Sequence, residues 1–89
     1  MGCRALQDDY LKNFLKCATN LELLDITWCR KITISSMNTA IEVTKNRTNN
    51  LLLEIRMNNT FINTNEIEER SPLLYLENFF SYNRFNLET

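Results

Sequence analysis

The chain has 89 residues, a net charge of −1 from 10 basic and 11 acidic side chains, and no histidine. A chain of this length forms one domain with a thin core, and its balanced charge gives no reason to expect nucleic-acid binding. No apolar run approaches the roughly 18 residues that cross a membrane, so we expect no membrane partner.

Residues 1–17 have the pattern of a helix. Leu11, Phe14 and Leu15 recur at spacings of three and four residues, which places them on one helical face. Asp8 stands where its carboxylate can cap a helix that starts at the next residue. We therefore predict a helix with one apolar face.

Residues 18–49 combine a strand and a helix. We predict a strand over about 23–27, with Leu24 and Ile26 on the same side because side chains alternate along a strand. Cys29 and Ile32 then turn inward. Thr33, Ser35 or Ser36 caps the following helix, whose expected inward residues are Met37, Ala40, Ile41 and Thr44.

Residues 50–70 repeat the pattern with less apolar character. Leu53 and Ile55 follow Leu24 and Ile26 by 29 residues, Asn58 takes the place of Cys29, and Phe61 or Ile62 replaces Ile32. Asn63 or Thr64 is expected to cap a short helix over 66–70, in which Ile67 is the one clearly apolar residue. This unit is therefore predicted to pack weakly.

Residues 71–89 begin with Ser71 and Pro72, which end the preceding helix pattern. The following stretch, 73–80, is apolar and aromatic. We expect it to add an edge strand or to cover the open end of the core, because an exposed end of a repeat stack is otherwise left unprotected.

Three features carry a resemblance to a known family. They are the spacing Leu21-x-x-Leu24-x-Ile26-x-x-Cys29-x-x-Ile32, the half pattern that runs from Cys3 to Cys17, and the Trp28–Cys29 pair. They resemble the cysteine-containing leucine-rich repeats of F-box proteins.

The resemblance implies a short α/β solenoid of two to three repeats, with parallel strands on one side and helices on the other. Its parts are a half repeat at 1–17, a full repeat at 18–49, a degenerate repeat at 50–70 and a capping tail at 71–89. Together, residues 1–70 form the repeat segment.

In that family the repeats hold a protein substrate for a cullin-based (SCF) ubiquitin ligase, and a separate F-box segment docks to the ligase adaptor. No F-box-like segment is found in this sequence. The chain thus resembles the C-terminal substrate-recognition end of such a protein. The partners implied are a substrate of the ligase and the rest of a longer repeat chain.

A concave strand face is the usual binding surface of a solenoid. The candidate partner-binding residues are those that point outward from the two predicted strands: Leu23, Asp25, Thr27, Leu52, Glu54 and Arg56. We expect non-covalent protein binding there, without enzyme activity. The first alternative is a structural cap that contacts no partner.

The second alternative is a thiol-dependent enzyme, which the cysteines do not favour. Spacings of 14 and 12 residues between Cys3, Cys17 and Cys29 lack the paired ligands of a zinc site. Without histidine there is no usual base to activate a thiol. We expect Cys17 and Cys29 to be packed core residues, with no disulfide framework, metal or other cofactor.

The first residues, 1–6, lack the apolar stretch of a signal peptide. We therefore expect a cytoplasmic or nuclear protein. The Asn-x-Thr sequences at Asn46 and Asn58 are then interpreted as chance matches to the glycosylation pattern.

Overall fold

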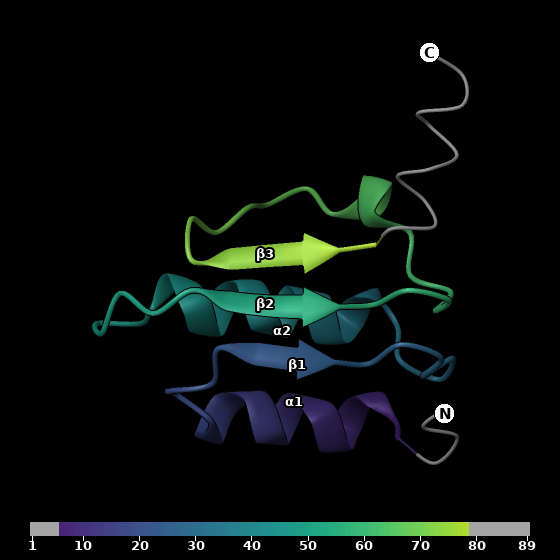
Figure 1. Cartoon of the computed structure of the whole chain (residues 1–89), viewed down its shortest axis with the longest axis horizontal. Coiled ribbons are helices and arrows are strands. Elements are labelled where there is room, and N and C mark those ends of the chain that lie inside the picture. The colour runs from purple at the N-terminus through teal and green to yellow at the C-terminus, as the bar shows by residue number, and fades with distance from the viewer. Residues whose placement is uncertain (1–5, 79–89) are drawn as a thin grey trace.

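The computed structural model describes residues 6–78. The elements run in the order α1 (Asp8–Cys17), β1 (Leu23–Asp25), α2 (Ile34–Lys45), β2 (Leu53–Arg56), the 3-10 helix η1 (Thr64–Glu66) and β3 (Leu74–Glu77). Helix α2 lies behind the sheet, and α1 packs against α2 (Figure 1). The expected α/β class is confirmed.

The three strands form one parallel sheet in the order β1-β2-β3. Leu24 lies opposite Ile55 in the β1–β2 register, and Ile55 lies opposite Leu76 in the β2–β3 register. The predicted match of Leu24 with Leu53, 29 residues later, is therefore wrong by two residues, because alternation along a strand fits both alignments. The β1–α2–β2 connection crosses behind the sheet in the right-handed sense, as expected for parallel strands (Figure 1).

The core lies between the sheet and the helices. It is built from residues with at most 4% of their surface exposed: Leu11, Leu15, Ile26, Cys29, Ile32, Met37, Ala40, Leu53, Ile55, Met57 and Ile62. The predicted inward face of α2 is confirmed, including the buried Thr44. Ile62, rather than the exposed Phe61, fills the position of Ile32.

Leu24 is less buried than predicted. It is only half-buried and packs at the margin of the core. Strand β1 is an edge strand among the described residues, so one side of its backbone and part of Leu24 lack a covering neighbour. The fully buried strand residues lie instead on the central strand β2.

Asp8 does not cap its own helix. Helix α1 begins at Asp8, and Gln7 before it makes no side-chain capping bond. The Asp8 carboxylate accepts hydrogen bonds from the Thr33 N–H (3.0 Å), the Thr33 hydroxyl (2.7 Å) and the Ser36 hydroxyl (2.5 Å). It thus lies at the N-terminus of α2, where a negative charge is favourable. The Thr33 side chain accepts from Ser35 N–H, as predicted for a cap.

The helix predicted over 66–70 is not formed. Asn63 accepts from the Asn65 N–H as expected, but the chain makes only the short 3-10 turn η1 and then runs on without helix. The single apolar residue Ile67 supplies too little burial to stabilise a helix, because short helices depend on packing.

The segment predicted as a tail joins the sheet. Strand β3 pairs with β2 along its whole length, so the predicted edge strand is confirmed for Leu74–Glu77. A buried contact ties this region to α2, since the Thr44 and Ser71 hydroxyl oxygens lie 2.8 Å apart. The rest of the proposed tail, from residue 79 on, lies outside the described residues.

One polar side chain also joins the two loops that lead into β1 and β2. The Arg47 guanidinium donates to the carbonyl oxygens of Leu21 (2.7 Å), Leu51 (2.8 Å) and Ala18 (3.4 Å). One arginine therefore satisfies carbonyl groups in the loops before β1 and β2 and fixes the two loops relative to each other.

Candidate functional site

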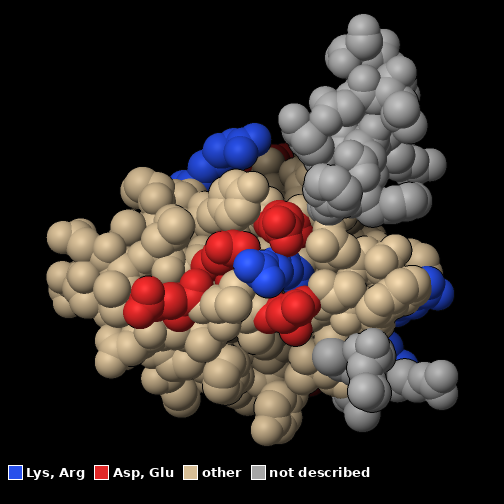
Figure 2. Space-filling model, in the orientation of Figure 1, with Lys and Arg blue, Asp and Glu red and all other residues tan. Residues whose placement is uncertain are grey.

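One face of the sheet is not covered by helices, and we call it the open face. Side chains alternate along each strand, so it carries two outward residues from every strand: Leu23, Asp25, Glu54, Arg56, Tyr75 and Glu77. Figure 2 views the molecule from this side and shows acidic side chains gathered around a basic one near its centre.

The strand registers arrange these residues in two rows across the sheet. Leu23 lies opposite Glu54, which lies opposite Tyr75. The next row places Arg56 between Asp25 and Glu77. The first row therefore has apolar margins and an acidic centre, and the second row is charged throughout.

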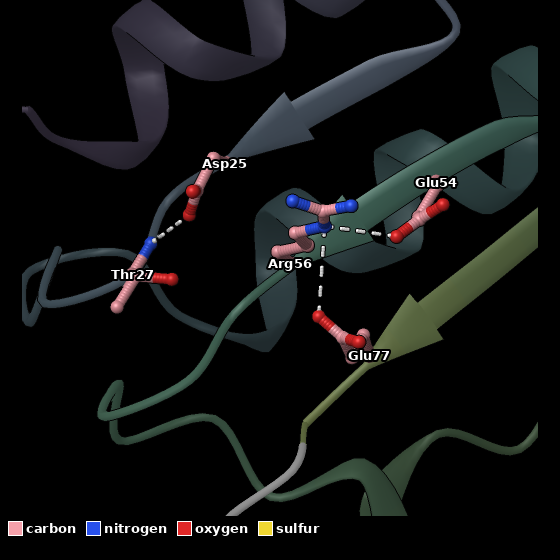
Figure 3. A network of polar contacts seen from close by, with 5 residues as sticks. All are labelled: Asp25, Thr27, Glu54, Arg56 and Glu77. Atoms are coloured by element: carbon pink, nitrogen blue, oxygen red, sulfur yellow. Dashed lines mark hydrogen bonds and ion pairs between the residues drawn. The ribbon is translucent and has the colours of Figure 1, made fainter.

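Arg56 is the centre of an ion-pair network (Figure 3). Its Nε lies 2.9 Å from Glu54 Oε2 and 3.7 Å from Glu77 Oε1. Asp25 lies on the other side and accepts a hydrogen bond of 3.0 Å from the Thr27 N–H. Three carboxylates thus surround one guanidinium, and the group as a whole carries excess negative charge.

Two members of the network, Asp25 and Arg56, have pKa values shifted toward their charged forms. Hydrogen bonds from the Thr27 side chain and amide, with a smaller contribution from Arg56, lower the pKa of the Asp25 carboxyl below its ordinary value. The hydrogen bond and charge of Glu54 raise the pKa of Arg56, so the guanidinium stays protonated. The contacts around Asp25 and Arg56 consequently favour the charged forms of both side chains.

Exposed apolar side chains flank the charged row. Leu23 is 48% exposed, Tyr75 is 53% exposed, and Leu52, just before β2, is 47% exposed. Their positions on β1, β3 and the start of β2 spread them over the whole width of the sheet.

Four of the six predicted binding residues meet on the open face, namely Leu23, Asp25, Glu54 and Arg56. Leu52 lies beside them, before the first residue of β2. Thr27 lies beyond the end of β1 and is half-buried; its amide holds the Asp25 carboxylate.

Tyr75 and Glu77 are not among the predicted binding residues, because residues 71–89 were predicted to be a capping tail. The signal was present in the alternation Leu74-Tyr75-Leu76-Glu77, which matches the alternation of buried and outward residues on β2.

The cysteines differ from what was predicted. Cys17 is exposed and a free thiol rather than packed in the core. Cys29 is fully buried as expected, but it is disulfide-bonded, which was not expected. Within residues 6–78, no group of three or more acidic, cysteine or histidine side chains is placed to hold a metal ion. In the same residues, no helix combines the length and apolar character needed to span a bilayer.

Comparison with protein-family models, with curated proteins and with solved structures found no match to this chain. Interpretation of the open face therefore depends on its own geometry and on the sequence resemblance described above.

Proposed function

We propose that the chain is a protein-binding module and that the open face of its sheet contacts the partner. The observation that carries the proposal is a helix-free sheet face on which Leu23 and Tyr75 flank the charged network of Arg56. Protein interfaces commonly combine aromatic and arginine anchors with a polar rim. Binding here requires no chemistry of the module's own.

The charge of the face indicates the kind of partner. Three carboxylates face one guanidinium, so a partner segment with a lysine or arginine beside an apolar residue fits it best. Charge complementarity of this kind speeds association and excludes acidic competitors. Three short strands cover less than the roughly 800 Å² per partner of a standard interface, so the contact extends beyond the sheet or is transient.

The finer proposal is that the module is the substrate-recognition end of an F-box-type leucine-rich-repeat subunit of a cullin-based ubiquitin ligase. Its support is the sequence spacing, together with two long-range side-chain contacts that have similar sequence separations. Asp8 contacts Thr33 25 residues later, and Thr44 contacts Ser71 27 residues later. The partner would then be a protein destined for ubiquitin-dependent degradation.

A second candidate, a structural cap for a longer repeat array, has its own support. On α1, Tyr10 is 72% exposed and Phe14 is 41% exposed, at i and i+4 on one helical side. Strand β1 also has no neighbour on its outer edge among the described residues. A further repeat would cover both features. In this alternative the open face contacts no partner.

The experiment that tests binding is affinity purification of the tagged chain from its native cells, with quantitative mass spectrometry. The wild type is compared with Glu54→Lys, which reverses a charge on the open face, and with Glu68→Lys, an exposed control away from it. We expect a partner that is lost with Glu54→Lys and kept with Glu68→Lys, and that binds the purified chain directly. Identical recoveries from all three would contradict the proposal.

Depletion of the chain from the same cells tests the ligase proposal. Accumulation of the partner and loss of its ubiquitination are expected, whereas direct recovery of the cullin-linked adaptor is not, because the sequence contains no F-box-like segment. A partner whose level and ubiquitination do not respond to the chain would leave a binding module without a role in degradation.

The finer proposal also places the chain in the cytoplasm or nucleus. The disulfide at Cys29 is a feature more typical of oxidising compartments. Alkylation of thiols in freshly lysed cells, before and after reduction, decides between a reducing and an oxidising compartment. A reduced Cys29 in cells agrees with the proposal, and an oxidised Cys29 contradicts this location.

A further inference from the structure

A second cluster lies in the loops that follow β1 and β2, outside the open face. The Arg30 guanidinium carbon lies 5.3 Å from the centroid of the Trp28 ring and 5.3 Å from that of the Phe61 ring. The two loops lie side by side at the arrowhead end of the sheet (Figure 1), and the Trp28 N–H donates to the Asn58 carbonyl at 3.0 Å. Three residues from two segments thus form one exposed group.

Two aromatic rings hold the guanidinium in place. Both distances fall within the range in which a ring attracts a cation, and a planar guanidinium stacks on rings in a way that an ammonium does not. Trp28 is 44% exposed and Phe61 is 75% exposed, so neither ring serves mainly to fill the core.

The backbone at Trp28 is unusual for its residue type. Trp28 has φ of 70°, in the left-handed region, which bulky residues seldom adopt. The β1–β2 register pairs Leu23 with Glu54, and the same offset brings Trp28 to Asn59, which has φ of 59°. Both loops therefore use a left-handed residue at the same position. Asparagine is suited to that conformation, so backbone geometry does not explain a tryptophan there.

The guanidinium donors are not engaged within the described part of the chain. No side chain or carbonyl of residues 6–78 forms an ion pair or hydrogen bond with Arg30, whereas Arg56 and Arg47 are both engaged. The segments 26–33 and 57–63 contain no acidic residue, and Lys31 adds a second positive charge. The loop cluster is thus basic and aromatic, in contrast to the acidic open face.

We propose that Trp28, Arg30 and Phe61 form a binding site for a carboxylate of a partner polypeptide, an Asp or Glu side chain next to an apolar residue. The fork of the Arg30 guanidinium binds the two carboxylate oxygens, and the exposed rings contact the apolar neighbour. Tryptophan and arginine are the residues most often found at interface hot spots. This site lies outside the open face, and its test does not depend on the open face.

The chain has one tryptophan, so its fluorescence reports this site directly. The probes are three capped peptides, Leu-Leu-Glu-Leu-Leu, the same peptide with Gln for Glu, and the same peptide with phosphoserine for Glu. We expect a saturable change in Trp28 emission with the Glu peptide and at least tenfold weaker binding of the Gln peptide. The phosphoserine peptide is expected to bind no more than tenfold tighter than the Glu peptide.

Variants distinguish binding by the Arg30 guanidinium from nonspecific attraction by positive charge. Arg30→Gln is expected to weaken binding of the Glu peptide at least tenfold, and Arg30→Lys several-fold, because the fork is lost. Lys31→Gln removes one positive charge at the adjacent residue and should change the affinity for the Glu peptide less than threefold. Glu54→Lys on the open face should leave it unchanged, so failure of the open-face proposal is distinguishable from failure here.

Equal binding of the Glu and Gln peptides would overturn the proposal, as would equal effects of Arg30→Gln and Lys31→Gln. Binding of the phosphoserine peptide alone would overturn the assignment of a carboxylate. Thermal melts of each variant by circular dichroism confirm that the fold is kept.

Discussion

The two faces of the sheet use the same strands for different purposes. On β2, Leu53 and Ile55 are fully buried beneath the helices, while Glu54 and Arg56, their neighbours in sequence, form ion pairs on the open face. The covered face holds the fold together by burial, and the open face carries charge at little cost to stability. Substitutions on one strand should therefore separate stability from binding.

The largest expected effect comes from the covered face. Ile55→Ala should lower the free energy of unfolding by about 2–5 kcal/mol, because it removes buried methyl groups and leaves a cavity. For a domain of this size that loss is enough to unfold most of the population. Glu54→Gln, one residue away on the other face, should change stability by no more than about 0.5 kcal/mol. Similar losses in urea denaturation for both variants would contradict the comparison.

The next largest effect on stability is expected where α1 contacts the start of α2. Asp8→Ala should cost about 0.5–2 kcal/mol, the range found when a capping side chain is replaced by Ala, because the carboxylate accepts from Thr33 and Ser36 at the start of α2. Asp9→Ala, at the adjacent exposed position, is the control. An equal loss for the two variants would mean that Asp8 does not cap α2.

The contribution of Asp8 should depend on pH. Burial raises the pKa of Asp8, but its hydrogen bonds to Ser36 and Thr33 outweigh this and lower the pKa below the ordinary value of 3.8. A group with a lowered pKa in the folded state stabilises the fold above its unfolded pKa, and the effect is lost as the pH falls through the folded value. The stability difference between wild type and Asp8→Ala should be constant above about pH 5 and shrink below about pH 4. A difference that grows on acidification would contradict the assignment.

A smaller effect is expected where α2 meets the chain before β3. Thr44→Val removes the hydroxyl 2.8 Å from that of Ser71, in a buried setting. A double-mutant cycle of Thr44→Val and Ser71→Ala should give a coupling of about 0.5–1.5 kcal/mol, as for a buried hydrogen bond. Additive effects of the two substitutions would show that this contact does not join β3 to the fold.

The smallest effect on stability is expected on the open face. Arg56→Gln should leave the melting temperature unchanged, because exposed ion pairs contribute little. It should also make the face more acidic and so increase the association rate of a basic partner, most clearly at low salt. A large drop in melting temperature would mean that the network supports the fold rather than recognition.

Local sequence patterns predicted the buried residues correctly where burial follows the period of a strand or helix. The alternation on β2 and the helical spacing of Met37, Ala40 and Ile41 correctly identified the buried residues. The prediction for Asp8 was wrong, because the partner of its carboxylate is 25 residues away and sequence spacing indicates only local caps.

The segment 50–70 and the candidate site show the same limit. Residues 66–70 have polar helix formers but lack a face to bury, so propensity did not produce a helix. Four of the six predicted binding residues meet on the open face, yet Tyr75 and Glu77 were missed, because the alternation of residues 74–77 does not by itself show which strand they pair with. The group of Trp28, Arg30 and Phe61 was likewise visible only once the two loops lay side by side.

The most direct test of the central claim is site-specific photo-crosslinking in native cells. A photoreactive phenylalanine analogue is placed at Tyr75 on the open face and, in a separate chain, at the exposed Glu42 on α2. We predict a defined crosslinked partner from position 75 and none from position 42. Crosslinks from position 42 alone, or none from position 75, would contradict the claim that the open face is the binding surface.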